Sequence, residues 1–507
     1  MPSSRRRDLV AAVYLGTFMA TLAISIVTVA LPSIQAALGT DLSGLQWVVG
    51  SYALCLSAFM LSAGPISDRY GRKRVWLVGV ALFSTGSAIS AMASSLGTLI
   101  AGSALQGIAG ALVIPGALSI LTQAFADPAQ RAHVIGGWAS FSAVSLILGP
   151  MLGGFLVDTV GWSSIFLINI PLGAITMALG LRGISESADP DHAALDPVGQ
   201  ALSVVFLGAL TYALIGAGDA GWTSPHIAGA LAVAIAGFVA FIAMELRAAR
   251  PVLPVDLFRD RQFAAVNFAS FALGFSGYSS LFFFSLFLQQ VQGLSATAAG
   301  WRMTPVFVAM ALTSSLFGKL SSWCGTRWPM IVGYALLGSS MLAMALFTPG
   351  TPYPIIASVF AILGIGMGLA VPSTGASAMA ATPRERSGAA SATMNALRQG
   401  GMTVGIALLG TLMSARAISS LTDYLSTTNA TDALGAATTA VRQHAMPAGL
   451  DMAPDLFRSL LAEAIGQGFS MAVACAGALG LLAAAVLVAV GQHTLRDHGP
   501  NLAIDPG

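Results

Sequence analysis

The chain has 507 residues, of which 56% are hydrophobic and only 9% carry a charge, compared with roughly 25% charged residues in an ordinary soluble domain. This balance excludes a soluble globular protein and predicts a membrane protein. The net charge of +2 is spread over many short loops, which argues against a nucleic-acid-binding surface.

Apolar runs of about 20 residues, the length that a helix needs to cross roughly 30 Å of hydrocarbon, alternate with charged or Pro/Gly-rich segments along the chain. The first run is too long for the apolar part of a signal peptide, so we interpret it as a membrane span. We predict fourteen spans, at residues 9–31, 46–66, 75–94, 98–122, 134–157, 163–182, 198–217, 225–246, 264–290, 297–319, 329–347, 353–378, 389–414 and 463–490.

Placing the N-terminus in the cytoplasm puts most Lys and Arg residues into cytoplasmic segments, as the positive-inside rule requires. One span more or fewer would move the later basic clusters to the wrong side. The charge pattern therefore supports an even number of spans, and we expect both termini to be cytoplasmic.

A short sequence repeat predicts two related halves. GPISDRYGRK begins at Gly64 and GKLSSWCGTR begins at Gly318, with glycine at the first and eighth positions of both. Parallel six-helix repeats are common in secondary transporters. We predict a six-helix half, an inserted helix pair with its linkers, a second six-helix half with a long flexible external loop, and a cytoplasmic tail, at residues 1–182, 183–262, 263–490 with the loop at 415–462, and 491–507.

The segment GPISDRYGRKR, between the second and third spans, places one acid among several cations in a tight turn. Asp68 can accept hydrogen bonds from a helix N-terminus and release them when the two halves move. We predict that Gly64, Asp68, Arg69, Gly71 and Arg72 form a conformational latch, with a solvated basic loop as the alternative.

The fifth span contains GPMLGG. Pro150 removes a backbone hydrogen bond, and the glycines let another helix approach closely. We predict a kinked, closely packed hinge at Gly149, Pro150, Gly153 and Gly154. Small residues at this spacing also occur in membrane helices for packing alone.

These segments together resemble the major facilitator superfamily, and within it the fourteen-helix drug:proton antiporter branch, which contains multidrug and antibiotic exporters. GPISDRYGRKR is similar to the loop motif of the superfamily, and LILGPMLGG to the antiporter motif of its fifth helix. GWSSIFLINIPLG and SGAASATMNALRQGG resemble the starts of its sixth and thirteenth helices, and LFLQQVQGLSATAAGWRMTP its ninth-to-tenth helix region. The resemblance covers nearly the whole chain and implies two six-helix halves plus two inserted helices.

Three charges that are usual in this branch are missing. Ala23 stands where the first helix usually has an acid, and Ser103 and Ser163 stand where arginine is common. None of the acids lies deep in a predicted span, although a proton-coupled carrier needs a group that gains and loses a proton, usually a buried carboxylate. The resemblance implies proton antiport, whereas the residues leave open a carrier without proton coupling.

Polar side chains within the predicted spans are candidates for lining a substrate cavity. Arg398 is the strongest, because burying an arginine costs about 3 kcal/mol on insertion scales and such a residue usually faces a cavity or a partner. A cavity with one arginine and no carboxylate favours neutral or anionic molecules. The candidates are Gln46, Tyr52, Gln106, Asn267, Gln289, Asn395 and Arg398.

The sequence contains no ATP-binding phosphate loop, HExxH zinc motif or GxSxG nucleophile elbow, so we expect a carrier that is not an enzyme and has no cofactor or metal. We predict a secondary active transporter in the bacterial plasma membrane. It would export a small hydrophobic drug, antibiotic or toxic metabolite by alternating access, as a monomer and driven by protons. The alternatives are a carrier without proton coupling, either a facilitator or a specific anion or metabolite exporter, and a transporter-like sensor without net flux.

Overall fold

The computed structural model describes residues 3–188, 196–248, 253–383, 386–427, 432–447, 450 and 452–497. Within these residues the chain is helical and contains no strand. The helices are α1 (Ser3–Leu38), α2 (Leu42–Tyr70), α3 (Arg72–Ala91), α4 (Leu96–Ala124), α5 (Pro128–Thr159), α6 (Ser164–Leu167), α7 (Asn169–Gly183), α8 (Pro197–Ala220), α9 (Pro225–Glu245), η1 (Val255–Arg259), α10 (Arg261–Leu273), η2 (Gly274–Tyr278), α11 (Ser279–Leu286), η3 (Phe287–Val291), α12 (Ala296–Cys324), α13 (Arg327–Met344), α14 (Tyr353–Ala380), α15 (Ser387–Ser426), α16 (Ala433–Gln443) and α17 (Pro454–Asp497).

In the described part of the chain, 13 helical segments are long and apolar enough to cross a membrane. The remaining predicted span, residues 329–347, corresponds to α13, which has 18 residues and begins with Arg327, Trp328 and Pro329. These three residues lower its mean hydropathy. Because α13 packs against α14 and α17, and 18 residues at 1.5 Å each reach about 27 Å, it occupies the place of the predicted span. The prediction of an all-helical membrane protein is confirmed.

Two of the predicted spans are not regular α-helices. The sixth is divided into α6 and α7 at Ile168. The ninth runs through α10 and α11 and contains two π-helical turns, η2 and η3. Such turns are rare and occur frequently at functional sites, so the ninth span is a place to look for one.

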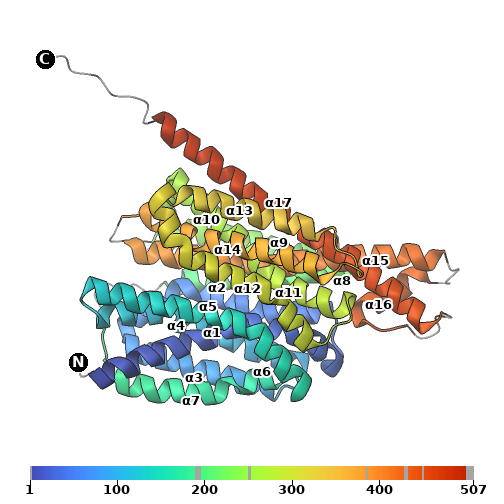
Figure 1. Ribbon diagram of the computed structural model, residues 1–507, viewed down its shortest axis with the longest axis horizontal. Coiled ribbons are helices and arrows are strands. Elements are labelled where there is room, and N and C mark those ends of the chain that lie inside the picture. Colours follow the sequence, from blue (N-terminus) through green and yellow to red (C-terminus); the bar gives the residue numbers. More distant parts are fainter. Residues whose placement is uncertain are drawn as a thin grey trace.

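The helices form two layers, with α1 to α7 in one and α10 to α17 in the other (Figure 1). In the first layer α1 packs against α5 and α7, and α4 packs against α2 and α3. In the second, α14 packs against α12 and α13, and α17 packs against α13 and α15. The layers meet mainly where α2 contacts α15 and α5 contacts α12. The residue boundaries predicted for the two halves stay predictions.

The inserted pair lies along the seam between the layers. α8 packs against both α2 and α15, and α9 packs on α8. Gln200 Nε2 donates a hydrogen bond to the Ala58 carbonyl oxygen of α2 at 3.0 Å, and the Thr411 hydroxyl of α15 donates to the Leu214 carbonyl oxygen at 2.7 Å. α8 therefore holds one helix of each layer. In the predicted linkers, 189–195 and 249–252 lie outside the described residues.

The segment predicted as a long flexible loop, 415–462, is mostly helical, and the prediction was wrong in this respect. α15 continues into it, α16 lies in its middle and α17 covers its last part. Asp432 caps α16 by accepting a hydrogen bond from the Gly435 backbone N–H at 2.9 Å. Ala437 and Val441 are buried on one face of α16. The Thr- and Ala-rich composition concealed this apolar face, which is stabilised by packing mainly against α15 and also against α2 and α17.

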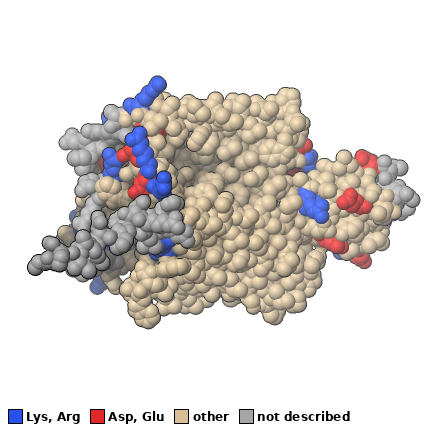
Figure 2. Space-filling view, turned by 90° about the horizontal axis from the view of Figure 1, so that it is seen from above, with Lys and Arg blue, Asp and Glu red and all other residues tan. Residues whose placement is uncertain are grey.

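Charged residues gather at the two ends of the molecule. Figure 2 shows a broad band without Lys, Arg, Asp or Glu between these ends on the face that is seen. α1 begins and α17 ends at one end, here called the α1 end, and α16 lies at the other, here called the α16 end (Figure 1). A bilayer surrounding the apolar band accounts for this distribution. Of the predicted tail at 491–507, residues 498–507 lie outside the described residues.

Candidate functional site

The predicted latch lies between α2 and α3. Gly71 joins the two helices with a φ of 101°, a conformation that residues with a Cβ rarely adopt. Arg72 is buried, and its Nη2 lies 2.6 Å from Asp68 Oδ1. A Cβ added at Gly64 would have no neighbour within 4 Å, and Arg69 is exposed. The structure therefore pairs Asp68 with Arg72 within one layer and leaves Gly64 and Arg69 to the side.

Glu186, which sequence analysis did not single out, holds this loop in place. Its Oε1 accepts a hydrogen bond from the Lys73 backbone N–H at 3.0 Å, and its Oε2 lies 3.6 Å from Arg74 Nε. The Arg72 backbone N–H donates to the Ser187 carbonyl oxygen at 2.8 Å. A carboxylate is favourable here because the first N–H groups of α3 lack helical partners and the helix dipole is positive there. The only sequence feature that could have identified Glu186 is its position as an acid shortly after the sixth predicted span.

One face of the fifth-span motif packs against α1. A Cβ added at Gly153 would lie 2.7 Å from Ile26 Cγ1 and 2.9 Å from the Ile26 carbonyl oxygen. A Cβ added at Gly149 would overlap Ser25. These two glycines let α5 and α1 approach within one layer, as expected for small residues at this spacing.

The opposite face of the same motif joins the two layers. A Cβ added at Gly154 would overlap the Ala296 carbonyl oxygen of α12. From the other side, a Cβ added at Gly300 of α12 would overlap the Pro150 carbonyl oxygen. The backbones of α5 and α12 are therefore in direct contact, and the motif that was predicted as a hinge lies in the contact between the layers.

Hydrogen bonds reinforce this contact. Asp158 Oδ2 accepts from the Thr297 backbone N–H at the start of α12, at 2.9 Å. Gln289 Nε2 of η3 donates to the Val29 carbonyl oxygen of α1, at 3.1 Å. Each bond connects one layer to the other, so both layers are held together at the α16 end.

Two of the predicted cavity residues, Tyr52 and Gln106, line a small void between the first layer and Met402 of α15. The void of about 20 Å³ is also lined by Ala23, Ser103 and Asn169 and has room for about one water molecule. The Asn169 Oδ1 atom is buried and has no hydrogen-bond partner among the described residues. None of the residues that line this void is acidic or basic. The fold thus brings together two positions at which the family usually carries charges.

Gln46 and Asn267 line neither this void nor the larger pocket described below. Gln46 Nε2 donates to the Ile406 and Ala407 carbonyl oxygens of α15, at 2.7 and 3.0 Å. Asn267 Nδ2 donates to the Phe263 carbonyl oxygen within α10, at 2.9 Å. Gln46 therefore connects α2 to α15, and Asn267 bonds within its own helix.

Asn395 and Arg398, both predicted from the sequence as cavity residues, contact each other. Arg398 Nη2 donates to Asn395 Oδ1 on the same helix, and the Arg398 guanidinium lies 5.6 Å from the centre of the Tyr278 ring. Both side chains are half-buried. The arginine is thus stabilised by an amide and an aromatic face beside the π-helical turn η2.

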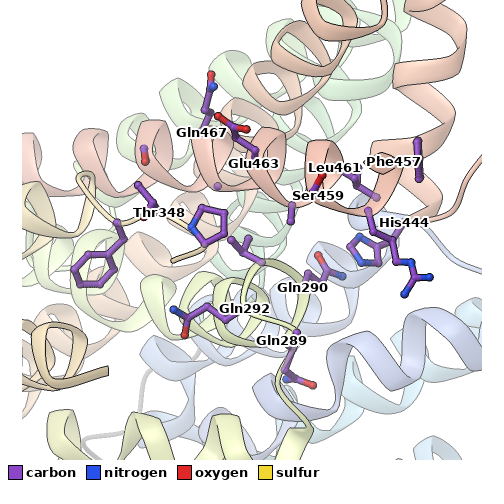
Figure 3. A pocket seen from close by; sticks show the side chains of 18 of the residues that line it. Gln289, Gln290, Gln292, Thr348, His444, Phe457, Ser459, Leu461, Glu463 and Gln467 are labelled. Atoms are coloured by element: carbon purple, nitrogen blue, oxygen red, sulfur yellow. The ribbon is translucent and has the colours of Figure 1, made fainter. Parts of the chain in front are cut away.

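Gln289 also lines an open pocket of about 1120 Å³ at the α16 end. Figure 3 shows its walls, with Gln289, Gln290 and Gln292 on one side and α17 residues on the other. Among the described residues, no group of three or more His, Cys, Asp or Glu side chains could hold a metal ion.

Two layers of membrane-spanning helices, a charged loop after the second span and a glycine contact between the layers define a polytopic membrane carrier. The chain belongs to the Major Facilitator Superfamily, because the model of that family matches residues 13–406. The resemblance predicted from the loop and fifth-span motifs is thereby confirmed, and the protein is a multi-pass membrane transporter.

Curated relatives of the chain are resistance and export proteins. The methylenomycin A resistance protein of Bacillus subtilis is 35% identical over 402 residues, covering 79% of this chain and 86% of the relative. The multidrug resistance protein Stp of Mycobacterium tuberculosis is 36% identical over 411 residues, covering 81% and 76%. The tetracenomycin C resistance and export protein of Streptomyces glaucescens is 30% identical over 498 residues, covering 97% and 92%.

Solved transporter structures share the fold. A bacterial homologue of the human lysosomal transporter Spinster, in an inward-facing and unoccupied conformation, has a TM-score of 0.63 at 20% identity and covers 97% of this chain and 99% of its own. A POT family transporter in complex with a thioalcohol-conjugated peptide has a TM-score of 0.66 at 12% identity, covering 96% and 97%. At these identities the likeness concerns the fold alone.

Proposed function

We propose that the protein exports a small hydrophobic drug, antibiotic or toxic metabolite across the bacterial plasma membrane by alternating access. The relatives named for drug resistance and export support the direction and the class of cargo. In this proposal the protein works as a monomer, both termini are cytoplasmic, and the α16 end faces outward.

The backbone contact of α5 with α12 carries this proposal. At the α16 end Gly154 meets Ala296 and Pro150 meets Gly300 across the two layers, whereas at the other end Asp68 pairs with Arg72 inside its own layer. A carrier that is sealed at the α16 end has this backbone contact. Cargo would enter between the layers from the cytoplasm, and the layers would then rock about the glycine contact.

The driving force is proposed to be a gradient, with proton antiport as the first candidate because of the family. The void beside Ala23 and Ser103 favours a second candidate, a carrier without proton coupling. That void lacks a titratable carboxylate, and proton coupling needs a group that changes its protonation during the cycle. Uptake into inside-out vesicles at fixed membrane potential, with and without an imposed pH gradient, separates the two. Uptake that depends on the gradient supports antiport, and uptake that ignores it supports the second candidate.

Export itself is tested by drug efflux and growth protection in a bacterial host that lacks its own pumps. We expect wild-type protein to protect against at least one neutral or anionic hydrophobic compound. Asp68→Asn removes the charge that holds Arg72 and should reduce efflux at least about tenfold. Asp423→Asn is the matched control, because Asp423 is exposed. A chain that binds compounds without any flux would instead be a sensor, and equal efflux of both variants would contradict the latch.

A further inference from the structure

We propose that the pocket at the α16 end is a binding site for an uncharged molecule of drug size that carries hydroxyl or N–H groups. The site lies at the α16 end of the second layer, and two of its lining residues, Gln289 and Gln290, bond to α1 of the first layer. Its assignment as a cargo site on the exit side rests on the proposed export function.

The pocket is large enough to hold a small organic molecule. Its volume of about 1120 Å³ lies slightly above the usual range of ligand pockets, which is about 300–1,000 Å³. Four segments form the walls: η3, the connection between α13 and α14, the segment that follows α16, and the first turns of α17. Figure 3 shows side chains from η3 and from α17 facing each other across it. Since α16 and the start of α17 fall in the segment predicted as a loop, the sequence did not reveal the pocket.

The lining combines an apolar surface with uncharged polar groups. Phe347 and Phe457 are 5% and 2% exposed and supply aromatic surface. Amide side chains of four glutamines lie around them, at Gln289, Gln290, Gln292 and Gln467. A few placed polar groups in an apolar wall are typical of sites for organic molecules, because burial gives affinity and the polar groups fix orientation.

The charged residues of the lining already have partners. Arg458 Nη2 lies 3.0 Å from Asp455 Oδ1, and Glu463 Oε1 accepts a hydrogen bond from the Tyr424 hydroxyl at 3.0 Å. His444 is kept neutral near pH 7, since burial lowers its pKa. One acid, one base and a neutral imidazole leave no net charge to select an ion, which favours an uncharged ligand.

Two glutamine oxygens and one imidazole nitrogen point to the hydrogen-bonding groups of the ligand. Gln289 and Gln290 use their amide nitrogens, Gln289 for the Val29 carbonyl oxygen and Gln290 for Gln35 Oε1 at 2.8 Å. Their own Oε1 atoms have no hydrogen-bond partner in the described part of the chain. The Nδ1 atom of His444 is buried and likewise has no partner among those residues. The two glutamine oxygens can accept hydrogen bonds from hydroxyl or N–H groups of a bound molecule.

The same two glutamines connect the pocket to the seal between the layers. Gln289 and Gln290 lie on the π-helical turn η3, and both bond to α1 of the first layer. A molecule that contacts their free oxygens therefore touches residues that hold the outer end closed. Occupancy of the pocket is expected to weaken this closure, as a site on the exit path requires.

Tetracenomycin C, an uncharged aromatic compound with several hydroxyl groups, is a suitable probe, and ethidium is a cationic comparison. Binding is measured by calorimetry on the purified full chain. Ser459 lines the pocket from α17 and is exposed, so Ser459→Trp should place a bulky ring in the pocket and weaken tetracenomycin C binding at least about tenfold. Leu456 is 51% exposed on the same helix and outside the pocket. Leu456→Trp is therefore the control and should change binding less than about twofold.

Gln290→Met keeps the approximate shape of the side chain and removes both its acceptor and its hydrogen bond to Gln35, so we expect binding to weaken by about fivefold. Tetracenomycin C binding that Ser459→Trp leaves intact, absent binding to wild-type protein, or tighter binding of ethidium would each overturn the proposal. Export is scored separately. If Ser459→Trp weakens binding but the wild-type protein shows no efflux, the proposed export function is wrong and the binding site stands. If the wild-type protein shows efflux that Ser459→Trp does not change, the binding site is wrong and the export function stands.

Discussion

The carbonyl oxygen of Ala296 on α12 lies directly against Gly154 on α5, so closely that a Cβ at position 154 would overlap it. Neither partner can yield by changing a rotamer, because one contact atom is backbone and the other position has no side chain. The contact therefore fixes how near the two layers can come at the α16 end.

We expect Gly154→Ala to open this contact and to reduce efflux at least about tenfold, since over-packing of a close helix contact typically costs about 1–3 kcal/mol. Efflux is compared with that of Gly136→Ala, which lies on the same helix where an added Cβ meets nothing within 4 Å. Equal efflux from the two variants at matched expression would show that the close contact is not needed for transport.

An alanine in the turn between α2 and α3 would have two effects that can be measured separately: backbone strain and the displacement of a neighbouring side chain. Gly71 and Gly161 have φ angles of 101° and 111°, so an alanine at either position should cost about 1–3 kcal/mol of strain. Only at Gly71 would the new Cβ also displace Glu186, whose Oε1 would lie 2.6 Å away, because Gly161 has open space. We expect both variants to lower the thermal midpoint, and only Gly71→Ala to reduce efflux strongly. Similar efflux from both would mean that strain alone matters.

Glu186 should matter through its carboxylate. Glu186→Ala removes the acceptor of the Lys73 N–H and the partner of Arg74, and losing such a cap costs about 1 kcal/mol. We expect a lower thermal midpoint and severalfold slower efflux. In the neighbouring control Ser187→Ala, the backbone carbonyl still accepts from Arg72, so both quantities should stay near wild type. The assignment fails if the two variants behave alike.

The stability of the region around α16 should depend on pH through His444. Burial lowers the pKa of His444 in the folded protein, so the unfolded state binds the proton more tightly. The contribution of His444 to stability is then complete above its unfolded pKa of about 6.5 and is lost as the pH falls toward the folded pKa. Hydrogen exchange of α16, corrected for its intrinsic rate, should be faster at pH 5.5 than at pH 7.5. His444→Asn, which tolerates the φ of 52°, should abolish the difference. A difference that persists in this variant would place the titrating group elsewhere.

The sequence by itself determined the architecture of this protein. Apolar runs matched to the thickness of a bilayer identify the spans, because a helix in lipid must satisfy its own backbone and needs a nearly fixed length. Short motifs with glycine and charge at fixed spacing located the turn at Gly71 and the glycines of α5. These signals are local, so they can be read without knowing what packs against them.

Only the tertiary structure decided what these residues contact. It showed that Gly153 packs against α1 while Gly154 packs against α12, a difference of one position that periodicity does not distinguish. It brought Glu186 to Lys73 across 113 residues and made α16 a helix by giving its apolar face a partner. The pocket at the α16 end arises in the same way, since three distant parts of the sequence, around residues 289–293, 345–349 and 444–470, supply its walls. Side-chain contacts between distant segments depend on how the helices rotate and pack against one another, and local sequence patterns do not determine that arrangement.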